Sequence, residues 1–205
     1  MGVGLKREVF LPFSVDQRKI LLVSRFKSTW VSGSISALRE RGHFERYESM
    51  LRAVARDAIV WAVPGGWLPT DLVLEHYRAC EELALTEGEL LALGARVTLR
   101  VQGTALAWGA RVATDAGVTP WTLFGQFHRL WARVMDGGGV TVFKHGPKDA
   151  GVQLAGFPLA RYRYNQVATR GILTAMLGFF CSKVVVREVP SQRTPTGLTY
   201  LVQWA

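Results

Sequence analysis

The chain has few cysteines and no apolar run long enough to cross a membrane. Cys80 and Cys181 are the two cysteines among 205 residues. Two distant cysteines exclude the dense disulfide framework of small secreted domains, so we expect free thiols. The apolar run Gly171–Cys181 is well short of the ~20 residues that span a bilayer. Because the first residues also lack the apolar core of a secretory signal, we expect a cytoplasmic chain with no membrane span.

Acidic residues are outnumbered, mainly toward the C-terminus. The chain holds 25 Lys and Arg against 16 Asp and Glu, for a net charge of +9. Residues 128–205 hold 10 against 3, a net of +7. Such a field favours an acidic protein partner, nucleic acid or another anion, although a merely solvated basic surface is the simpler interpretation. The candidate anion- or partner-binding residues are Arg161, Arg163, Arg170, Lys183 and Arg187.

Short catalytic and phosphate-binding motifs are missing. The sequence has no G-x-S-x-G turn, no H-E-x-x-H or C-x-x-C pair, and no glycine run with phosphate-loop spacing. His76 and Cys80 stand four residues apart on one helix face, which is a spacing that can hold a metal, but two ligands are too few. We therefore expect no catalytic residue and no metal site, while an enzyme site assembled from dispersed residues stays open.

The last third of the chain predicts a hairpin, a helix and a hairpin. Strand-like runs at 139–145 and 151–157 precede a helix over Arg161–Cys181, and runs at 183–189 and 198–204 follow it. Turn residues separate each pair of runs. In the last run Leu198, Tyr200, Val202 and Trp204 share one face, which is typical of an antiparallel sheet covered on one side.

Helices are predicted before this unit. Their expected ranges are Ser28 or Thr29 to Arg41, His43 to Trp61, Thr70 to Leu83, Leu90 to about Val112, and Pro120 to Met135. We expect Thr70 and Thr119 to cap two of them, and Thr86 with Glu89 to form a capping box. The fold class is therefore α+β in a single domain over 1–205: an extended segment at 1–27, a helical half at 28–136, and a hairpin–helix–hairpin half at 137–205.

An aromatic stripe on the last of these helices predicts a ligand site. Trp121, Phe124, His128 and Trp131 recur at helical spacing, and large rings leave gaps that an apolar ligand can fill. His128 could orient such a ligand or serve as an axial haem ligand. A histidine at the edge of the core is the simpler interpretation.

Several stretches carry a resemblance to a known group of sequences. They are Gly66–Pro69, His76–Cys80, Val118–Trp121, Gly146–Lys148, Gly156–Arg161 and Tyr200–Trp204. These stretches, spread over about residues 28–205, resemble an uncharacterised domain family of this length with many paralogues in myxobacteria. That family implies no function.

More distantly, the layout resembles the fold shared by H-NOX haem sensors, four-vinyl-reductase-type domains and TRAPP vesicle-tethering subunits. The resemblance implies a helical half on an antiparallel sheet, often with a hydrophobic ligand or acyl chain between them. The haem sensors carry a Tyr-x-Ser-x-Arg signature that is missing here. The vinyl-reductase type usually has cysteines by its final hairpin, and the turn between the last two strand-like runs of this chain has none. We therefore expect no haem.

Together these observations predict a non-enzymatic, cytoplasmic sensory or adaptor domain. It would bind a lipophilic small molecule or a protein partner, and it could form a homodimer. The alternative is a nucleic-acid or anion-binding module that uses the basic C-terminal half.

Overall fold

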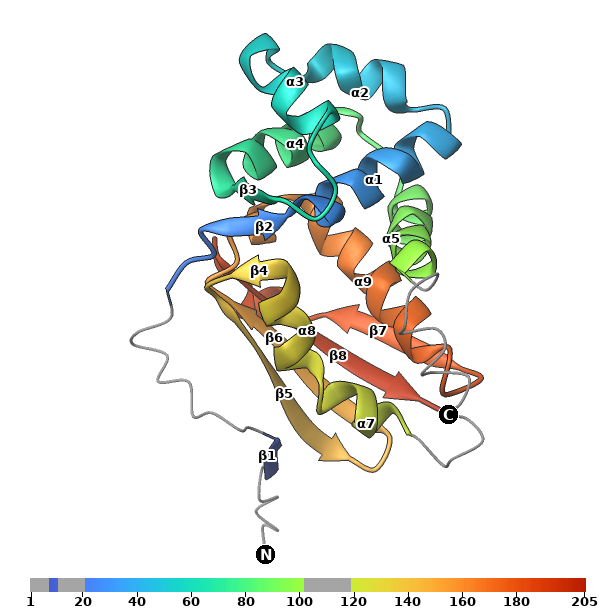
Figure 1. Ribbon diagram of the computed structural model, residues 1–205. Coiled ribbons are helices and arrows are strands. Elements are labelled where there is room, and N and C mark those ends of the chain that lie inside the picture. The colour runs from blue at the N-terminus through green and yellow to red at the C-terminus, as the bar shows by residue number, and fades with distance from the viewer. Residues whose placement is uncertain (1–7, 11–20, 102–118) are drawn as a thin grey trace, which may run out of the picture.

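A computed structural model describes residues 8–10, 21–101 and 119–205 of the chain (Figure 1). Helices α1 to α4 gather at one end, an antiparallel sheet forms the other, and α5 and α9 lie side by side between them. The helices are α1 (Ser28–Glu40), α2 (Phe44–Met50), α3 (Ala53–Val60), α4 (Thr70–Glu82), α5 (Glu87–Val101), α7 (Pro120–Phe124), α8 (Phe127–Val134) and α9 (Arg163–Leu177).

The main sheet has five strands in the order β1-β5-β6-β8-β7, all antiparallel. Its strands are β1 (Glu8–Phe10), β5 (Gly139–Gly146), β6 (Asp149–Ala155), β7 (Val184–Glu188) and β8 (Gly197–Trp204). The predicted α+β class and the hairpin–helix–hairpin order are thus confirmed. Leu198, Tyr200, Val202 and Trp204 are all buried on one face of β8, as their period of two predicts.

A second, three-stranded sheet was not predicted. It joins β3 (Trp67–Pro69), β2 (Arg25–Lys27) and β4 (Met135–Asp136) in that order. These strands have two or three residues each, too few for an alternating pattern to stand out in a sequence. The small sheet ties the start of α1 and the start of α4 to the end of α8, so it fixes the helical half against the main sheet.

Helix α9 packs closely against α5 at two glycines. A Cβ added at Gly94 on α5 would overlap the backbone carbonyl of Ala168, and one at Gly171 on α9 would overlap that of Leu91. Only residues without a side chain allow the two backbones so near to each other. The predicted helix Arg161–Cys181 is shorter at both ends: residues Pro158–Arg161 form a separate 3-10 turn ahead of α9, and α9 ends at Leu177, before Gly178.

The predicted single helix from His43 to Trp61 is wrong. Leu51 and Arg52 have extended backbones, with ψ of 136° and 137°, and they separate α2 from α3. The backbone N–H of Arg52 donates to Glu75 Oε1 at 3.0 Å instead of to a helical carbonyl. Because Glu75 lies on another helix, 23 residues away, the local pattern could not show this break.

The predicted cap at Thr70 is also wrong. Thr70 Oγ1 donates to the carbonyl oxygen of Val23 at 2.7 Å, and the residue before α4, Pro69, makes no side-chain cap. Thr119 occupies the N-cap position of α7 as predicted, but its side chain makes no cap hydrogen bond. The capping box is confirmed, since the backbone N–H of Thr86 donates to Glu89 Oε2 at 2.7 Å and Glu89 N–H donates to Thr86 Oγ1 at 3.3 Å.

The expected helix from Pro120 to Met135 is two helices. It begins at Pro120 as predicted, but α7 ends at Phe124 and α8 begins at Phe127. Gly125, a poor helix former, occupies the break. The predicted extension of the preceding helix to Val112 lies outside the described residues beyond Val101. No helix in the described ranges is long and apolar enough to cross a membrane.

Candidate ligand cavity

A cavity of about 380 Å³ lies where α8, α9 and the main sheet meet. One wall comes from α8 and the residues beside it, and two others come from the sheet and from α9 with α5. The α8 wall is lined by Leu123, Phe127, Leu130, Trp131, Arg133, Val134 and Met135. The sheet contributes Val140, Val152 and Leu154, and Phe157 follows the end of β6. The remaining lining residues are Thr29, Trp30, Val97, Thr98, Thr169, Ile172, Leu173, Met176, Phe179 and Phe180.

The Trp131 ring is held rigidly at the wall. Its Nε1–H donates to the carbonyl oxygen of Gly137 at 2.9 Å. The ring meets Phe157 edge-on, with centroids 5.4 Å apart. Gly138 stands close behind, and a Cβ there would come within 3.0 Å of the indole. The wall is thus set by contacts that exist before any ligand is bound.

The back wall depends on the glycine contact between α5 and α9. Val97 and Thr98 follow Gly94 on α5 by about one turn, and Ile172 and Met176 lie one and five residues after Gly171 on α9. The backbones approach most closely at the glycines, and these larger side chains line the cavity beside them. Sequence reasoning did not name these residues. The signal was present, because the second half of α9 is apolar on most of its sides.

The predicted aromatic stripe is divided between two places. Trp131 lines the cavity. Trp121 and Phe124 pack instead on Trp204, with ring centroids 5.1 and 5.8 Å away. His128 is half-buried and does not line the cavity. The break at Gly125 separates α7 from α8, so side chains at helical spacing across it no longer share one face. That Trp121, Phe124 and His128 bind a ligand stays a prediction.

The cavity is poor in polar chemistry. Its lining contains three threonines, Thr29, Thr98 and Thr169, and one charged residue, Arg133. Thr98 Oγ1 donates toward the carbonyls of Gly94 and Ile172, at 3.4 Å each. No Asp, Glu, His, Cys or Lys is among the lining residues that the structure describes. The character of this lining suits an apolar molecule.

The predicted basic residues lie along and beyond α9. Arg161 and Arg163 are at its start, and Lys183 is past its end. A helix of this length spans about 22 Å, so the set is not gathered at one point. The side chain of Arg170 forms an ion pair with Glu87 at 2.6 Å, which offsets its charge. Anion binding by Arg161, Arg163, Arg170, Lys183 and Arg187 stays a prediction.

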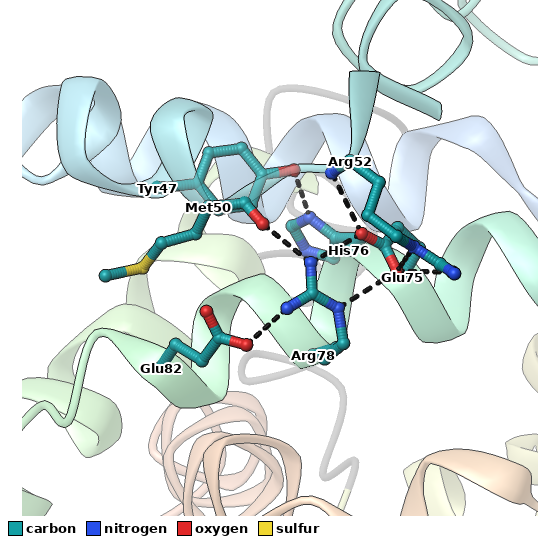
Figure 2. A network of polar contacts seen from close by, with 7 residues as sticks. All are labelled: Tyr47, Met50, Arg52, Glu75, His76, Arg78 and Glu82. Atoms are coloured by element: carbon teal, nitrogen blue, oxygen red, sulfur yellow. Dashed lines mark hydrogen bonds and ion pairs between the residues drawn. The ribbon is translucent and has the colours of Figure 1, made fainter. Parts of the chain in front are cut away.

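A dense polar network joins α2, α3 and α4 (Figure 2). Glu75 is its centre, with a side chain only 1% exposed. The Arg52 side chain donates to Glu75 Oε2 at 2.7 Å, and Arg78 Nη2 donates to Glu75 Oε1 at 2.6 Å. Arg78 also donates to the Met50 carbonyl and pairs with Glu82. Bonds from Arg78 and Arg52 lower the pKa of Glu75 to about 2, against the opposing effect of burial. Each charged side chain of this network has a partner within it, so the network serves to hold the three helices together.

His76 and Cys80 lie in the core of the helical half. His76 is fully buried, with the Tyr47 hydroxyl 2.7 Å from its Nδ1 and Cys80 Sγ 3.6 Å from its Nε2. Burial lowers the pKa of His76 to about 3 and raises the pKa of the Cys80 thiol. Within the described part of the chain, no group of three metal-ligating side chains surrounds them. Cys80 and Cys181 are both free thiols, as expected.

Comparisons with known proteins identify the fold. No protein-family model matches the sequence, and no curated protein does. A mutant H-NOX protein from K. algicida in its Fe(II) unliganded form is similar, with a TM-score of 0.62, 8% identity, and coverage of 87% of this chain and 96% of that one. An oxygen-binding H-NOX domain related to soluble guanylate cyclases has a TM-score of 0.58 and 13% identity, over 87% of this chain and 94% of that one. A mutant H-NOX of T. Tengcongensis has a TM-score of 0.56 and 14% identity, over 87% and 97%. The chain therefore has the fold of H-NOX domains, which confirms the distant resemblance seen in its sequence layout.

Proposed function

We propose that this chain is a non-enzymatic sensory domain that binds an apolar small molecule in the cavity between α8, α9 and the main sheet. The observation that carries the proposal is the cavity itself: about 380 Å³, lined almost wholly by apolar and aromatic side chains. Ligand pockets have this size and this character. The fold supports it, since the similar structures are H-NOX domains, among them an oxygen-binding domain related to soluble guanylate cyclases.

Haem does not fit the donors of this cavity. Proteins hold haem iron chiefly through His, Cys or Tyr, or through Met paired with His. The four histidines, two cysteines and five tyrosines of the chain all fall within its described residues, and none lines the cavity. The thioethers of Met135 and Met176 are the sulfur donors there. We therefore derive no role for haem. A stable haem complex whose Soret band disappears in Met135→Leu or Met176→Leu would contradict this conclusion.

The lining also supports a role without catalysis. Its polar groups are threonine hydroxyls, the indole N–H groups of Trp30 and Trp131, and the Arg133 guanidinium, with no carboxylate, imidazole or thiol among the described lining residues. A ligand held there would act by changing the packing of α8 and α9 against the sheet. A shift of those helices is the kind of change by which binding reaches a partner protein.

The test is to fill the cavity. Met176→Trp places a large ring into the space, while Thr174→Trp adds the same ring at an exposed position of the same helix. Native mass spectrometry of the protein purified from its natural host would identify a retained apolar molecule. Thermal unfolding would then measure its stabilising effect. We expect Met176→Trp to remove both signals and Thr174→Trp to keep them. Equal ligand binding by both variants would refute the proposed site.

A further inference from the structure

Arg133 gives the cavity a charged side. It is the charged residue among the described lining residues, and it belongs to the last turn of α8. Its side chain is exposed while still contacting the cavity. An arginine can lie along an apolar wall with its methylene groups and keep its guanidinium in water at the edge. Arg133 thus adds one positive charge to an otherwise apolar lining.

The surrounding acids do not neutralise Arg133. Asp136, three residues later, is paired with Arg25, whose Nη2 lies 2.6 Å from its Oδ2. Arg129, one turn earlier on α8, donates to Gln126 Oε1 at 3.1 Å and does not line the cavity. Among the described residues, Arg133 makes no hydrogen bond or ion pair, so its five N–H donors are available to a ligand.

We propose that the ligand of this cavity is amphipathic, with an apolar body inside and a carboxylate at the edge that pairs with Arg133. The inference rests on the proposed function and adds the chemical class of the ligand. A guanidinium matches a carboxylate with two parallel hydrogen bonds, a geometry that lysine cannot offer. The net charge of +9 of the whole chain also favours an anionic ligand over a neutral one.

The experiment compares straight-chain carboxylates, from octanoate to hexadecanoate, with the alcohols of equal length. Affinity is measured by quenching of tryptophan fluorescence at low and high salt. For the unmodified protein we expect the carboxylate to bind about fivefold or more tightly than its alcohol, a ratio set by a partly exposed ion pair. This ratio of carboxylate affinity to alcohol affinity should fall as the salt concentration rises, because ions screen exposed charges.

Variants separate the two proposals. Arg133→Gln should bring the ratio close to one with little change for the alcohol, Arg133→Lys should restore part of it, and Arg129→Gln should leave it unchanged. Equal binding of carboxylate and alcohol, or a ratio that survives Arg133→Gln, overturns the carboxylate inference but leaves the apolar cavity site standing. Failure of both compounds to bind overturns the inference together with the proposed function.

Discussion

The Tyr47 hydroxyl and His76 Nδ1 lie 2.7 Å apart in the core between α2 and α4. The two rings meet edge-on with centroids 5.2 Å apart, and both residues are 0% exposed. With no carboxylate bonded to it, the imidazole is neutral, and burial lowers its pKa to about 3. The Tyr47 hydroxyl and Nδ1 share one hydrogen bond, and Nε2 lies 3.6 Å from the Cys80 sulfur. This hydrogen bond connects the two helices without any charge.

His76 should make stability depend on pH. Its pKa is 6.5 ordinarily and about 3 in the fold, so between these values the unfolded chain binds one more proton than the folded one. The free energy of unfolding therefore falls as pH drops below 6.5, by up to about 1.4 kcal/mol per pH unit. Denaturant unfolding at a series of pH values measures this slope.

Two variants separate the effect of His76 on this slope from the effects of other titrating groups. His76→Gln keeps a polar partner for Tyr47 without a titrating ring, and the slope between pH 6.5 and 4.5 should decrease. His145→Gln, at an exposed position, should leave the slope as it is. The window stops at 4.5 because the Glu75 carboxyl begins to add its own loss of stability below its ordinary pKa of 4.5. An unchanged slope in His76→Gln would mean that the buried ring is not the cause.

Glu75→Gln should destabilise the helical half. The substitution removes the negative charge that Arg52 and Arg78 share, and hydrogen bonds to a charged group contribute about 1.5–3 kcal/mol. Glu82→Gln is the matched control on the same helix, since its pair with Arg78 is exposed and exposed pairs contribute about 0–1 kcal/mol. Equal losses in denaturant unfolding of the two variants would show that Glu75 is not the centre of the network.

The same network shows what local sequence could not predict. The residues from His43 to Trp61 have a helical pattern throughout, and the break at Arg52 depends on a carboxylate from another helix. Strands β5 to β8, by contrast, were predicted because their information is local. Turn residues and the alternating face of β8 lie within a few positions of each other. The pairing of β1 with β5 joins distant parts of the chain and was not predicted.

Of the predicted aromatic stripe, Trp131 lines the cavity between α8 and the sheet, and that these residues bind a ligand stays a prediction. Which residues line the cavity depends on the side of the helix on which they lie. The break at Gly125 changes that side between Phe124 and Phe127. Arg133 is on the cavity side of α8. An arginine on a helix is normally solvated, so its presence in the sequence does not indicate that it lines a cavity.

Gly94→Ala should lower stability by about 1–3 kcal/mol or more, the range for overpacking a core. The added methyl would overlap the Ala168 carbonyl and force α9 away from α5. Gly88→Ala, on the same helix but with nothing within 4 Å of the new Cβ, should be stabilising by up to about 1 kcal/mol. Chemical denaturation of the two variants gives the comparison. If Gly94→Ala also stabilises, the close helix contact is not as described.

Two tryptophans distinguish the cavity from the rest of the aromatic stripe. Trp131 lines the cavity, whereas Trp121 packs against Trp204 and donates from Nε1 to the Pro147 carbonyl at 2.8 Å. Trp131→Ala should weaken binding of the apolar ligand by tenfold or more, since a lost aromatic contact is worth about 1.5–3 kcal/mol. Trp121→Ala should reduce stability and leave the affinity of the folded protein within about twofold. Isothermal titration with a straight-chain carboxylate measures both affinities below the unfolding temperature of each variant. Loss of binding in Trp121→Ala, with Trp131→Ala unaffected, would place the ligand at α7 and Trp204 instead of in the cavity.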